Sequence, residues 1–371
     1  MRVLITGADG FVGKNLQLRL RERKDVELVT YTRADSVADL PKLLEGVDVV
    51  FHLAGVNRPK DPQEFVAGNA ELTQALSDMV RNSGRPMRVI LTSSTQVRMD
   101  NPYGLSKRQA EQSLQALAGK NGVSIHVFRL PNVFGKWCKP NYNSAVATFC
   151  HNIARGLPVQ INDPNASVTL VYIDDVLDRF IDLMDGADAA SDAEGFETVA
   201  PQYLVTVGEL VRQLESFRDS RTTLMTDRVG TGWIRALYST YISYQPVESF
   251  DYEVPRHADP RGVFVEMLKT QDSGQFSYFT AHPGVTRGGH YHHSKTEKFL
   301  VIKGEAKFRF RHMQSGQVHE LTTHGEVPRI VETVPGWTHD ITNVGQGEMV
   351  VMLWANEVFD RERPDTYACP V

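Results

Sequence analysis

Tyr103 and Lys107 stand four positions apart within the stretch 101–107. Residues at this spacing share one face of a helix, so the phenol and the ammonium group are expected to lie close together. A phenol normally titrates near pH ~10, and a neighbouring cation lowers its pKa. The spacing therefore predicts that Tyr103 serves as a general acid. Because the same spacing also occurs on ordinary surface helices, the neighbouring segments must decide.

A glycine-rich segment near the N-terminus predicts a nucleotide site. An apolar strand is expected over residues 2–6 and a helix over 14–23, and a GxxGxxG pattern lies between them. Such glycines allow a tight turn and a close backbone approach, so that free amides at the helix start can bind a pyrophosphate. The residues expected to bind the cofactor here are Gly7, Asp9, Gly10, Phe11, Val12 and Gly13.

Two further strands are expected to complete the cofactor site. The strand predicted over 27–31 ends beside the adenosine ribose and is followed by Arg33 instead of an acid. An arginine there can hold a 2′-phosphate through charge-assisted hydrogen bonds, which favours NADPH; the alternative is a solvated surface arginine. The strand predicted over 48–54 ends in small residues that let the cofactor pass close. This turn consists of Leu53, Ala54 and Gly55.

A cluster of hydroxyl groups follows the fourth expected strand, 88–91. Residues 92–95 are Thr, Ser, Ser and Thr, and they should reach the carboxyl end of the sheet, where ligands bind in open α/β folds. A hydroxyl there can hydrogen-bond a substrate carbonyl. The alternative is a turn that caps a helix, but Tyr103 and Lys107 follow at once.

Together these motifs resemble the extended short-chain dehydrogenase/reductases over roughly residues 1–245. The resemblance rests on residues 7–13, 53–55, 92–95, 103–107, 129–135 and 172–176. It implies an α/β Rossmann-type doubly wound parallel sheet, with Tyr103 as proton donor or acceptor. Lys107 would lower the pKa of Tyr103 and bind the nicotinamide ribose, and Ser94 would polarise the substrate oxygen. Only eight residues separate Ser94 from Tyr103, fewer than is usual in this family, so Thr95 could replace Ser94.

Enzymes of this extended type mostly act on nucleotide sugars, so the resemblance implies a UDP-sugar substrate. The polar stretch 136–143 lies where the diphosphate and base would be held. Its lysines suit phosphate and its aromatic side chains can stack on uracil, although an ordinary polar loop would look similar. The residues expected to bind substrate are Arg129, Asn132, Lys139, Asn141 and Tyr142.

The second half of the chain has a different pattern of expected secondary structure. After a linker expected over 245–248, short β-rich runs separated by glycines indicate a barrel or jelly roll. Within it, strand alternation places His290 and His292 on one face, and Glu297 and His339 can join them. Imidazole and carboxylate groups suit zinc or a similar divalent ion. The sequence therefore predicts one metal site, with His290, His292, Glu297 and His339 as ligands.

The spacing from Gly284 to Gly304, and from Pro335 to Asn343, resembles the two cupin motifs, and this resemblance covers roughly 250–371. A narrower resemblance competes with it. Residues 259–266 and 284–291 are similar to the deoxysugar 3,5-epimerases of dTDP-rhamnose synthesis, which usually work without metal. That resemblance would make His290 the base and Lys298 the group that steadies an enolate.

The two readings conflict because Glu297 and Lys298 are adjacent and cannot both face the interior of a regular strand. The metal set is favoured, since four ligands fit. A metal could stabilise the enolate by polarising a C4 carbonyl. His293 or a similar group is then left as the catalytic base.

The order of the two parts, predicted as 1–245 and 250–371, resembles a family of bifunctional capsular polysaccharide enzymes. It implies C3 epimerisation of a UDP-4-keto-6-deoxy-N-acetylhexosamine in the cupin. NADPH-dependent C4 reduction to UDP-2-acetamido-2,6-dideoxy-L-talose would follow in the reductase. One alternative is a reductase with a structural, dimerising cupin. Another is an NADPH-sensing module without catalysis, which the intact Tyr103 and Lys107 disfavour.

Composition limits the partners and the location. The 371 residues carry a formal charge of −5 without a long basic run, which argues against nucleic acid or an anionic membrane as the main partner. The three cysteines are few and odd in number, which favours a reducing compartment. No apolar run approaches the roughly 20 residues of a membrane span. We therefore expect a cytoplasmic protein, and a homodimer formed through the cupin, because cupins commonly pair their sheets.

Overall fold

The structure is a computed structural model that describes residues 1–255, 257–259, 262–264, 268–270, 274–357 and 362–371. The chain forms two compact units, one of residues 1–144 and 168–204 and the other of residues 145–167 and 205–371. Because each unit combines separate stretches of chain, the division at 1–245 and 250–371 stays a prediction. In the part of the chain described, no helix has both the length and the apolar character to cross a membrane.

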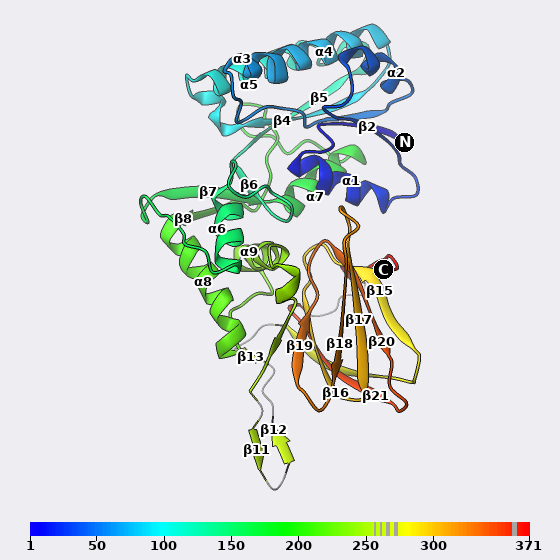
Figure 1. The fold of residues 1–371 in the computed structure, drawn as a ribbon. Coiled ribbons are helices and arrows are strands. Elements are labelled where there is room, and N and C mark those ends of the chain that lie inside the picture. Colours follow the sequence, from blue (N-terminus) through cyan, green and yellow to red (C-terminus); the bar gives the residue numbers. More distant parts are fainter. Residues whose placement is uncertain (256, 260–261, 265–267, 271–273, 358–361) are drawn as a thin grey trace. The chain divides into compact units, whose positions relative to one another are not determined.

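The first unit is built on a five-stranded parallel sheet with the order β2-β1-β3-β4-β5 (Figure 1). The strands are β1 (Arg2–Thr6), β2 (Glu27–Tyr31), β3 (Val49–His52), β4 (Arg88–Ser94) and β5 (Ser124–Leu130). This order confirms the predicted Rossmann-type doubly wound sheet. Strand β4 extends beyond the expected stretch 88–91 and carries Ser94 at its end.

Helices cover both faces of this sheet, with α4 and α5 on one side and α1 and α7 on the other (Figure 1). The helices of this unit are α1 (Phe11–Arg21), α2 (Leu40–Leu43), α3 (Gln63–Phe65), α4 (Leu72–Ser83), α5 (Pro102–Gln115) and α7 (Ile173–Met184). Because both faces are covered, the strands are continuous apolar runs, and Leu4, Val50 and Ile90 are completely buried. A π-helix, η2 (Val66–Glu71), leads into α4, and a short 3₁₀ helix, η3 (Thr95–Arg98), follows β4.

A three-stranded sheet with the order β6-β7-β8 extends the α/β part. Its strands are β6 (Asn132–Phe134), β7 (Ser167–Tyr172) and β8 (Tyr203–Thr206). Helices α6 (Ala145–Ala154), α8 (Val207–Thr223) and α9 (Gly232–Ser243) belong to the second unit.

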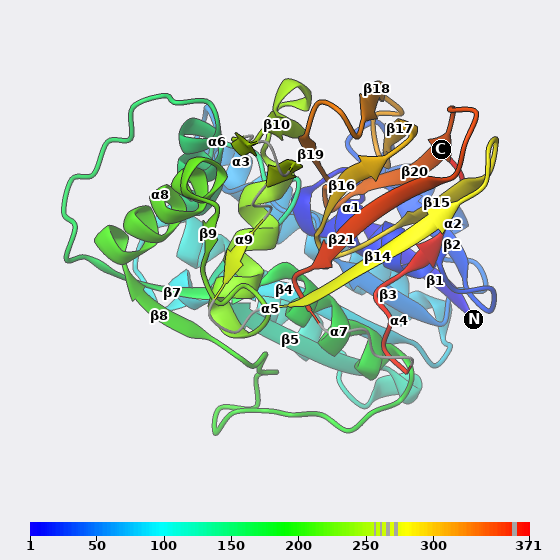
Figure 2. The same cartoon turned by 90° about the horizontal axis from the view of Figure 1, so that it is seen from below.

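Two five-stranded antiparallel sheets form the rest of the second unit. One has the order β10 (Asp251–Glu253), β19 (Arg329–Glu332), β16 (Glu297–Lys303), β21 (Met349–Ala355) and β14 (Gln275–Ala281). The other has the order β18 (Val318–His324), β17 (Glu305–His312), β20 (Trp337–Asn343), β15 (Thr286–Tyr291) and β22 (Tyr367–Ala368). Figure 2 shows β14 and β21 side by side. These sheets confirm the predicted all-β jelly roll of the cupin type.

Short two-stranded pairs lie outside these sheets. They are β11 (His257–Asp259) with β12 (Gly262–Phe264), and β9 (Met225–Thr226) with β13 (Lys269–Thr270). The motif predicted over 259–266 falls in this region. Four of its residues, Pro260, Arg261, Val265 and Glu266, lie outside the described residues.

Candidate active site and metal centre

The glycine turn after β1 has the geometry of a phosphate site. Gly7 has a φ of +69°, and a Cβ on it would lie 2.6 Å from the amide nitrogen of Ala54 in the turn after β3. Gly10 caps α1 without a side-chain hydrogen bond, and the first turn of this helix holds no acidic residue. The amides of Phe11, Val12 and Gly13 have no carbonyl acceptor one turn earlier, so they can bind a phosphate. The exposed Asp9 lies in the same turn.

We expect Gly7→Ala to abolish dinucleotide binding, because the new Cβ would overlap the backbone of Ala54. Fluorescence titration with NADPH measures the effect. Gly84→Ala is a matched control: Gly84 also has a positive φ, +63°, but a Cβ there would meet no atom within 4 Å. Equal binding by the two variants would contradict the assignment of the glycine turn.

The end of β2 holds both a cation and an acid. Arg33 is exposed, as a residue that meets a 2′-phosphate must be. Two positions later, the carboxylate of Asp35 accepts hydrogen bonds from the amide and the hydroxyl of Thr32, at 2.7 and 2.9 Å. The sequence prediction rested on Thr32 and Arg33, the two residues that follow the strand, and did not include Asp35. Because Asp35 is turned back onto Thr32, Arg33 is the charged group that remains exposed there.

The structure brings Ser94, Tyr103 and Lys107 to the carboxyl end of β4. Asn101 caps α5 by accepting a hydrogen bond from the Gly104 amide at 2.8 Å, and this fixes Tyr103 in the first turn. Tyr103 shares a hydrogen bond with Ser94. The ammonium group of Lys107, one helical turn later, is buried and donates to the carbonyl oxygen of Thr92 at 2.6 Å.

The electrostatics of this group differ in one respect from the expectation. Burial raises the pKa of Tyr103, and the hydrogen bond with Ser94 works in the opposite direction. Burial also lowers the pKa of Lys107 to about 8, although Glu111 opposes that shift. The pKa of Tyr103 is therefore raised by burial and not lowered, and Ser94 is the group that opposes this rise. The role predicted for Lys107 stays a prediction. At neutral pH, Tyr103 holds its proton and Lys107 is charged.

A buried polar network behind the site was missed by the sequence argument. Asn69 in the π-helix η2 donates to Ser106 Oγ at 3.0 Å and to the carbonyl oxygen of Val56 at 3.0 Å. His52 contacts the hydroxyls of Thr6 and Thr73 at 2.7 and 2.8 Å. Asn69 is a buried residue of η2, and no motif in the sequence connected it with the site.

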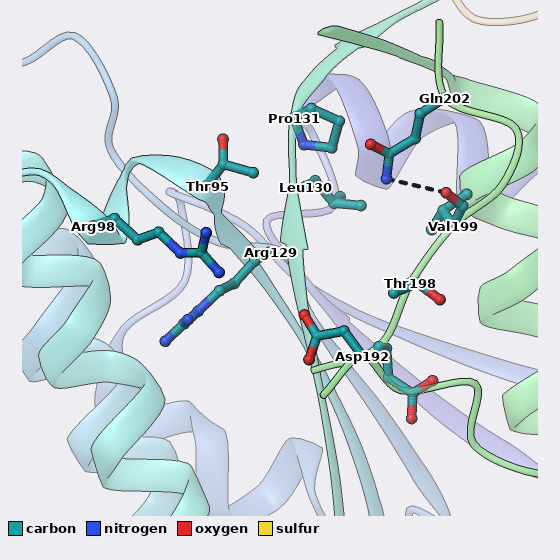
Figure 3. Close-up of a pocket in the computed structure, with 10 residues that line it drawn as sticks. Thr95, Arg98, Arg129, Leu130, Pro131, Asp192, Thr198, Val199 and Gln202 are labelled. Atoms are coloured by element: carbon teal, nitrogen blue, oxygen red, sulfur yellow. Dashed lines mark hydrogen bonds between the residues drawn. The ribbon is translucent and has the colours of Figure 1, made fainter. Parts of the chain in front are cut away.

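A cavity of about 180 Å³ opens beside Thr95, which directly follows Ser94. Figure 3 shows Thr95 and Arg98 on one side of it and Val199 and Gln202 on the other. The volume is smaller than the ~300–1,000 Å³ typical of sites for whole drug-sized ligands, so it suits one part of a larger substrate. Arg129, a predicted substrate residue, lines this cavity.

The side chain of Arg129 is already engaged inside the protein. It pairs with Glu111 at 2.8 Å and with Glu194 at 2.9 Å, and its guanidinium stacks 3.4 Å from the ring centroid of Phe196. Glu194 also pairs with Arg98 at 2.6 Å. Arg129 is therefore held in the cavity wall by two carboxylates that the sequence argument did not connect with it.

The other predicted substrate residues lie on β6 and the loop after it and are not among the residues that line this cavity. The amide of Asn132 donates to the carbonyl oxygen of Thr169 at 3.2 Å. Lys139 lies over the ring of Tyr142, 5.4 Å from its centroid, and Asn141 has a φ of +53°. Their role stays a prediction.

In the second unit the four predicted ligands come together. Ligand atoms of His290, His292, Glu297 and His339 all lie within 4.8 Å of one another. Strands β15 and β20 pair His290 with His339, and Glu297 begins β16. His292 Nε2 lies 3.1 Å from a carboxylate oxygen of Glu297. In a tetrahedral shell with zinc–ligand bonds of about 2.0–2.2 Å the ligand atoms lie roughly 3.3–3.6 Å apart, so the side chains would have to draw together by about 1 Å to bind zinc.

The residues themselves fit a metal ion. Both ring nitrogens of His339 are buried without a hydrogen-bond partner in the described part of the chain. Burial lowers the pKa of His290 to about 4 and that of His339 as well, which favours neutral imidazoles. Burial alone would raise the pKa of Glu297, but His292 holds it well below its ordinary value. Neutral imidazoles beside an ionised carboxylate suit zinc.

Lys298 and His293, the two other residues for which the sequence predicted a role in epimerisation, are not among the four grouped ligands. Lys298 is buried on the opposite side of β16, where it pairs with Glu332 at 2.8 Å and donates to the Tyr252 hydroxyl at 2.7 Å. Both Glu297 and Lys298 are buried, but strand alternation separates them as expected. The ring of His293 lies against the rings of Tyr291 and Tyr367, with centroids 5.6 and 4.9 Å away. Its role as base stays a prediction.

Comparisons with known proteins match both halves of the chain to known families. Residues 3–196 match the NAD dependent epimerase/dehydratase family, and residues 257–367 match the polysaccharide biosynthesis C-terminal domain. A Pseudomonas aeruginosa protein named UDP-2-acetamido-2,6-beta-L-arabino-hexul-4-ose reductase is 63% identical over 371 residues, which cover 100% of this chain and 99% of that protein.

Two other relatives extend the comparison. The crystal structure of the capsular polysaccharide assembling protein CapF from Staphylococcus aureus is 41% identical, with a TM-score of 0.69 and full coverage of both chains. The UDP-glucose 4-epimerase of Vibrio cholerae is 26% identical over 263 residues, 59% of this chain and 76% of that protein. The predicted resemblance is confirmed: the chain belongs to the NAD dependent epimerase/dehydratase family and carries, after it, a polysaccharide biosynthesis C-terminal domain.

Proposed function

We propose that the chain is an NADPH-dependent UDP-sugar 4-ketoreductase that also epimerises its substrate at C3. The observation that carries the reductase is the group formed by Ser94, Tyr103 and Lys107 beside the cavity at Thr95. The name of the Pseudomonas aeruginosa relative supports a 4-keto sugar as the class of substrate. The proposed product is UDP-2-acetamido-2,6-dideoxy-L-talose.

In the proposed reduction, Ser94 or Thr95 donates a hydrogen bond to the C4 oxygen and orients the ketone. NADPH, when bound, supplies the hydride that C4 accepts. The Tyr103 hydroxyl then gives its proton to the C4 oxygen as negative charge develops there. The charged Lys107 stabilises the resulting phenolate and contacts the nicotinamide ribose. The step balances, because the ketone takes one hydride at C4 from the cofactor and one proton at its oxygen from Tyr103.

In the proposed epimerisation, a base removes the C3 proton and a proton returns from the other face. His293 is the proposed base, and His290, His292, Glu297 and His339 would hold a divalent ion, zinc by their chemistry. Such an ion would act as a Lewis acid that acidifies the C3 proton of a 4-keto sugar. Four protein ligands are typical of structural zinc sites, so Lewis-acid action on the substrate would require a fifth ligand position. Only His290 among the four is half-exposed, so the substrate must reach the centre from that side.

Incubation with a UDP-4-keto-6-deoxy-N-acetylhexosamine and NADPH tests the proposal. The expected product carries inverted C3 and a C4 hydroxyl. A product reduced at C4 with C3 unchanged would leave the alternative, a reductase with a structural cupin. Failure to oxidise NADPH with any such sugar would overturn the reductase itself.

Arg33 is proposed to select NADPH over NADH. We expect Arg33→Ala to raise the KM for NADPH about 10–100-fold, since a charge-assisted hydrogen bond contributes about 1.5–3 kcal/mol. The KM for NADH should not change. Lys24→Ala, which removes an exposed cation just before β2, is the control. An equal change with both cofactors would contradict the assignment.

The pH profile should report on Lys107. Burial disfavours its charged form, so it loses its proton near pH 8 instead of at its ordinary value. We therefore expect kcat/KM for reduction to fall as pH rises through about 8. Lys107→Arg keeps its charge at all these pH values. Its kcat/KM should therefore stay constant through about pH 8, at a lower absolute activity. If kcat/KM of this variant still falls as pH rises through about 8, the loss of activity comes from another group.

Two further features are proposed with the function. Homodimerisation through the second unit is supported by β14, the end strand of its sheet, which exposes Phe276. Light scattering measures the mass in solution, and a monomer at all concentrations would overturn it. A cytoplasmic location is proposed from the three cysteines, a low and odd number for a disulfide framework.

A further inference from the structure

The segment 362–371 returns to the metal centre from the far end of the chain. The carboxylate of Asp365 accepts hydrogen bonds from three consecutive amides, those of His293 at 2.9 Å, Ser294 at 2.9 Å and Lys295 at 2.7 Å. These amides belong to the connection between His292 and Glu297, so one carboxylate fixes the backbone that carries two of the four ligand side chains. We call residues 364–369 the C-terminal strap.

The backbone of the same residue fixes the ring of His292. Nδ1 of His292 lies 2.6 Å from the carbonyl oxygen of Asp365. A carbonyl oxygen can only accept, so Nδ1 carries a proton, and Nε2 is the ring nitrogen left to face the ligand group. That Nε2 faces Glu297 at 3.1 Å, inside the ligand group. The strap therefore selects the tautomer that can bind a metal through Nε2.

Other contacts tie down the strap on both sides of Asp365. The ammonium group of Lys295 donates to the carbonyl oxygen of Pro364 at 2.9 Å and to Thr366 Oγ1 at 2.6 Å. Strand β22 pairs with β15, placing Ala368 opposite the ligand His290. The Cys369 amide donates to the carbonyl oxygen of Gly289 at 2.7 Å. The strap thus contacts the backbone around both His290 and His292.

From this arrangement we propose that Asp365 is a positioning residue of the metal centre, and that the C-terminal strap sets the tautomer and orientation of His292. A hydrogen bond to the second nitrogen of a ligand histidine is a recurrent way to raise metal affinity. A backbone carbonyl oxygen is one of the usual acceptors, and that of Asp365 takes this place for His292. The proposal rests on the proposed metal site, but its tautomer part concerns the metal-free protein.

The first experiment measures zinc affinity by competition with a chromophoric chelator, using the full-length protein. Asp365→Asn replaces the acceptor of three amides with a neutral group of equal size, and we expect zinc affinity to fall about 10–100-fold, the range found for such outer partners. Glu348→Gln, an exposed carboxylate in the same unit, is the control and should bind zinc like the wild type. Unchanged affinity in folded Asp365→Asn would overturn the proposal.

A second variant guards against a folding defect. Lys295→Met removes the two hydrogen bonds to Pro364 and Thr366 but leaves the three amides and β22 in place. We expect a smaller loss of zinc affinity in the same direction, with circular dichroism unchanged. If both variants are folded and neither loses affinity, the strap has only a structural role.

The tautomer is read separately by ¹⁵N NMR of the histidines in metal-free protein. We expect His292 to be protonated at Nδ1 in the wild type and to become a mixture of tautomers in Asp365→Asn. Protonation at Nε2 with Nδ1 unprotonated in the wild type would overturn the proposal whether or not zinc binds. Absence of zinc binding by the wild type, with His292 protonated at Nδ1, would instead overturn the metal centre of the proposed function and the positioning role with it.

Discussion

Tyr103→Phe is expected to lower kcat for NADPH oxidation by about 10²–10⁴-fold, the usual contribution of a positioned general acid. The substitution removes the phenol proton and the hydrogen bond with Ser94, but the ring can still pack against Phe65, whose centroid lies 5.6 Å away. The fold and cofactor binding should therefore survive. Stopped-flow fluorescence of NADPH, with a UDP-4-keto sugar as acceptor, gives the rate.

The same variant should retain exchange of the C3 proton, because that chemistry is assigned to other residues in the second unit. Tyr278→Phe, which removes an exposed phenol from β14, is the matched control and should oxidise NADPH like the wild type. Full reductase activity in Tyr103→Phe would contradict the role of Tyr103. Loss of both activities together would show that the two reactions are not divided between Tyr103 and the metal site.

Glu297→Gln is expected to have the second large effect. The carboxylate is the one anionic group among the four proposed ligands, and it lies buried beside His292 and His339 at 3.1 and 3.6 Å. Removing a direct ligand should weaken zinc binding by more than the ~10–100-fold that outer partners contribute. C3 exchange should disappear with the metal, while NADPH oxidation with an already epimerised 4-keto sugar should continue.

Metal content by mass spectrometry and C3 exchange by proton NMR check this expectation in one preparation. Glu305→Gln serves as the control, because it also removes one negative charge from the same barrel but at an exposed carboxylate on β17. Normal zinc content in Glu297→Gln would contradict the ligand set. Normal C3 exchange without zinc would instead favour a metal-free base such as His290.

Local signals made much of the fold predictable from the sequence. The GxxGxxG turn needs glycine because of the close approach of Ala54, and the apolar runs of β1 and β3 are buried on both faces. The spacing of His290 and His292 likewise indicated a metal site. The structure places both with Glu297 and His339, although His292 lies just beyond the end of β15. In these cases the chemistry is encoded within a few residues.

Contacts between distant residues could not be predicted in the same way. The partners of Arg129, Glu111 and Glu194, stand 18 positions before it and 65 positions after it, so the sequence predicted a substrate role for Arg129 but could not predict its ion pairs. Asp365 reaches the backbone of His293 across 72 positions. Lys298 was weighed only as a catalytic group, because its partner Glu332 is brought opposite it by the pairing of β16 with β19.

The most direct test of the central proposal is proton NMR of a UDP-4-keto-6-deoxy-N-acetylhexosamine with the protein in D2O, without NADPH, before and after chelation of metal. The proposal predicts that the C3 proton exchanges for deuterium, and that the exchange stops on chelation while the protein stays folded. Absence of exchange in the zinc-loaded protein would contradict the epimerase and leave a reductase with a structural C-terminal domain.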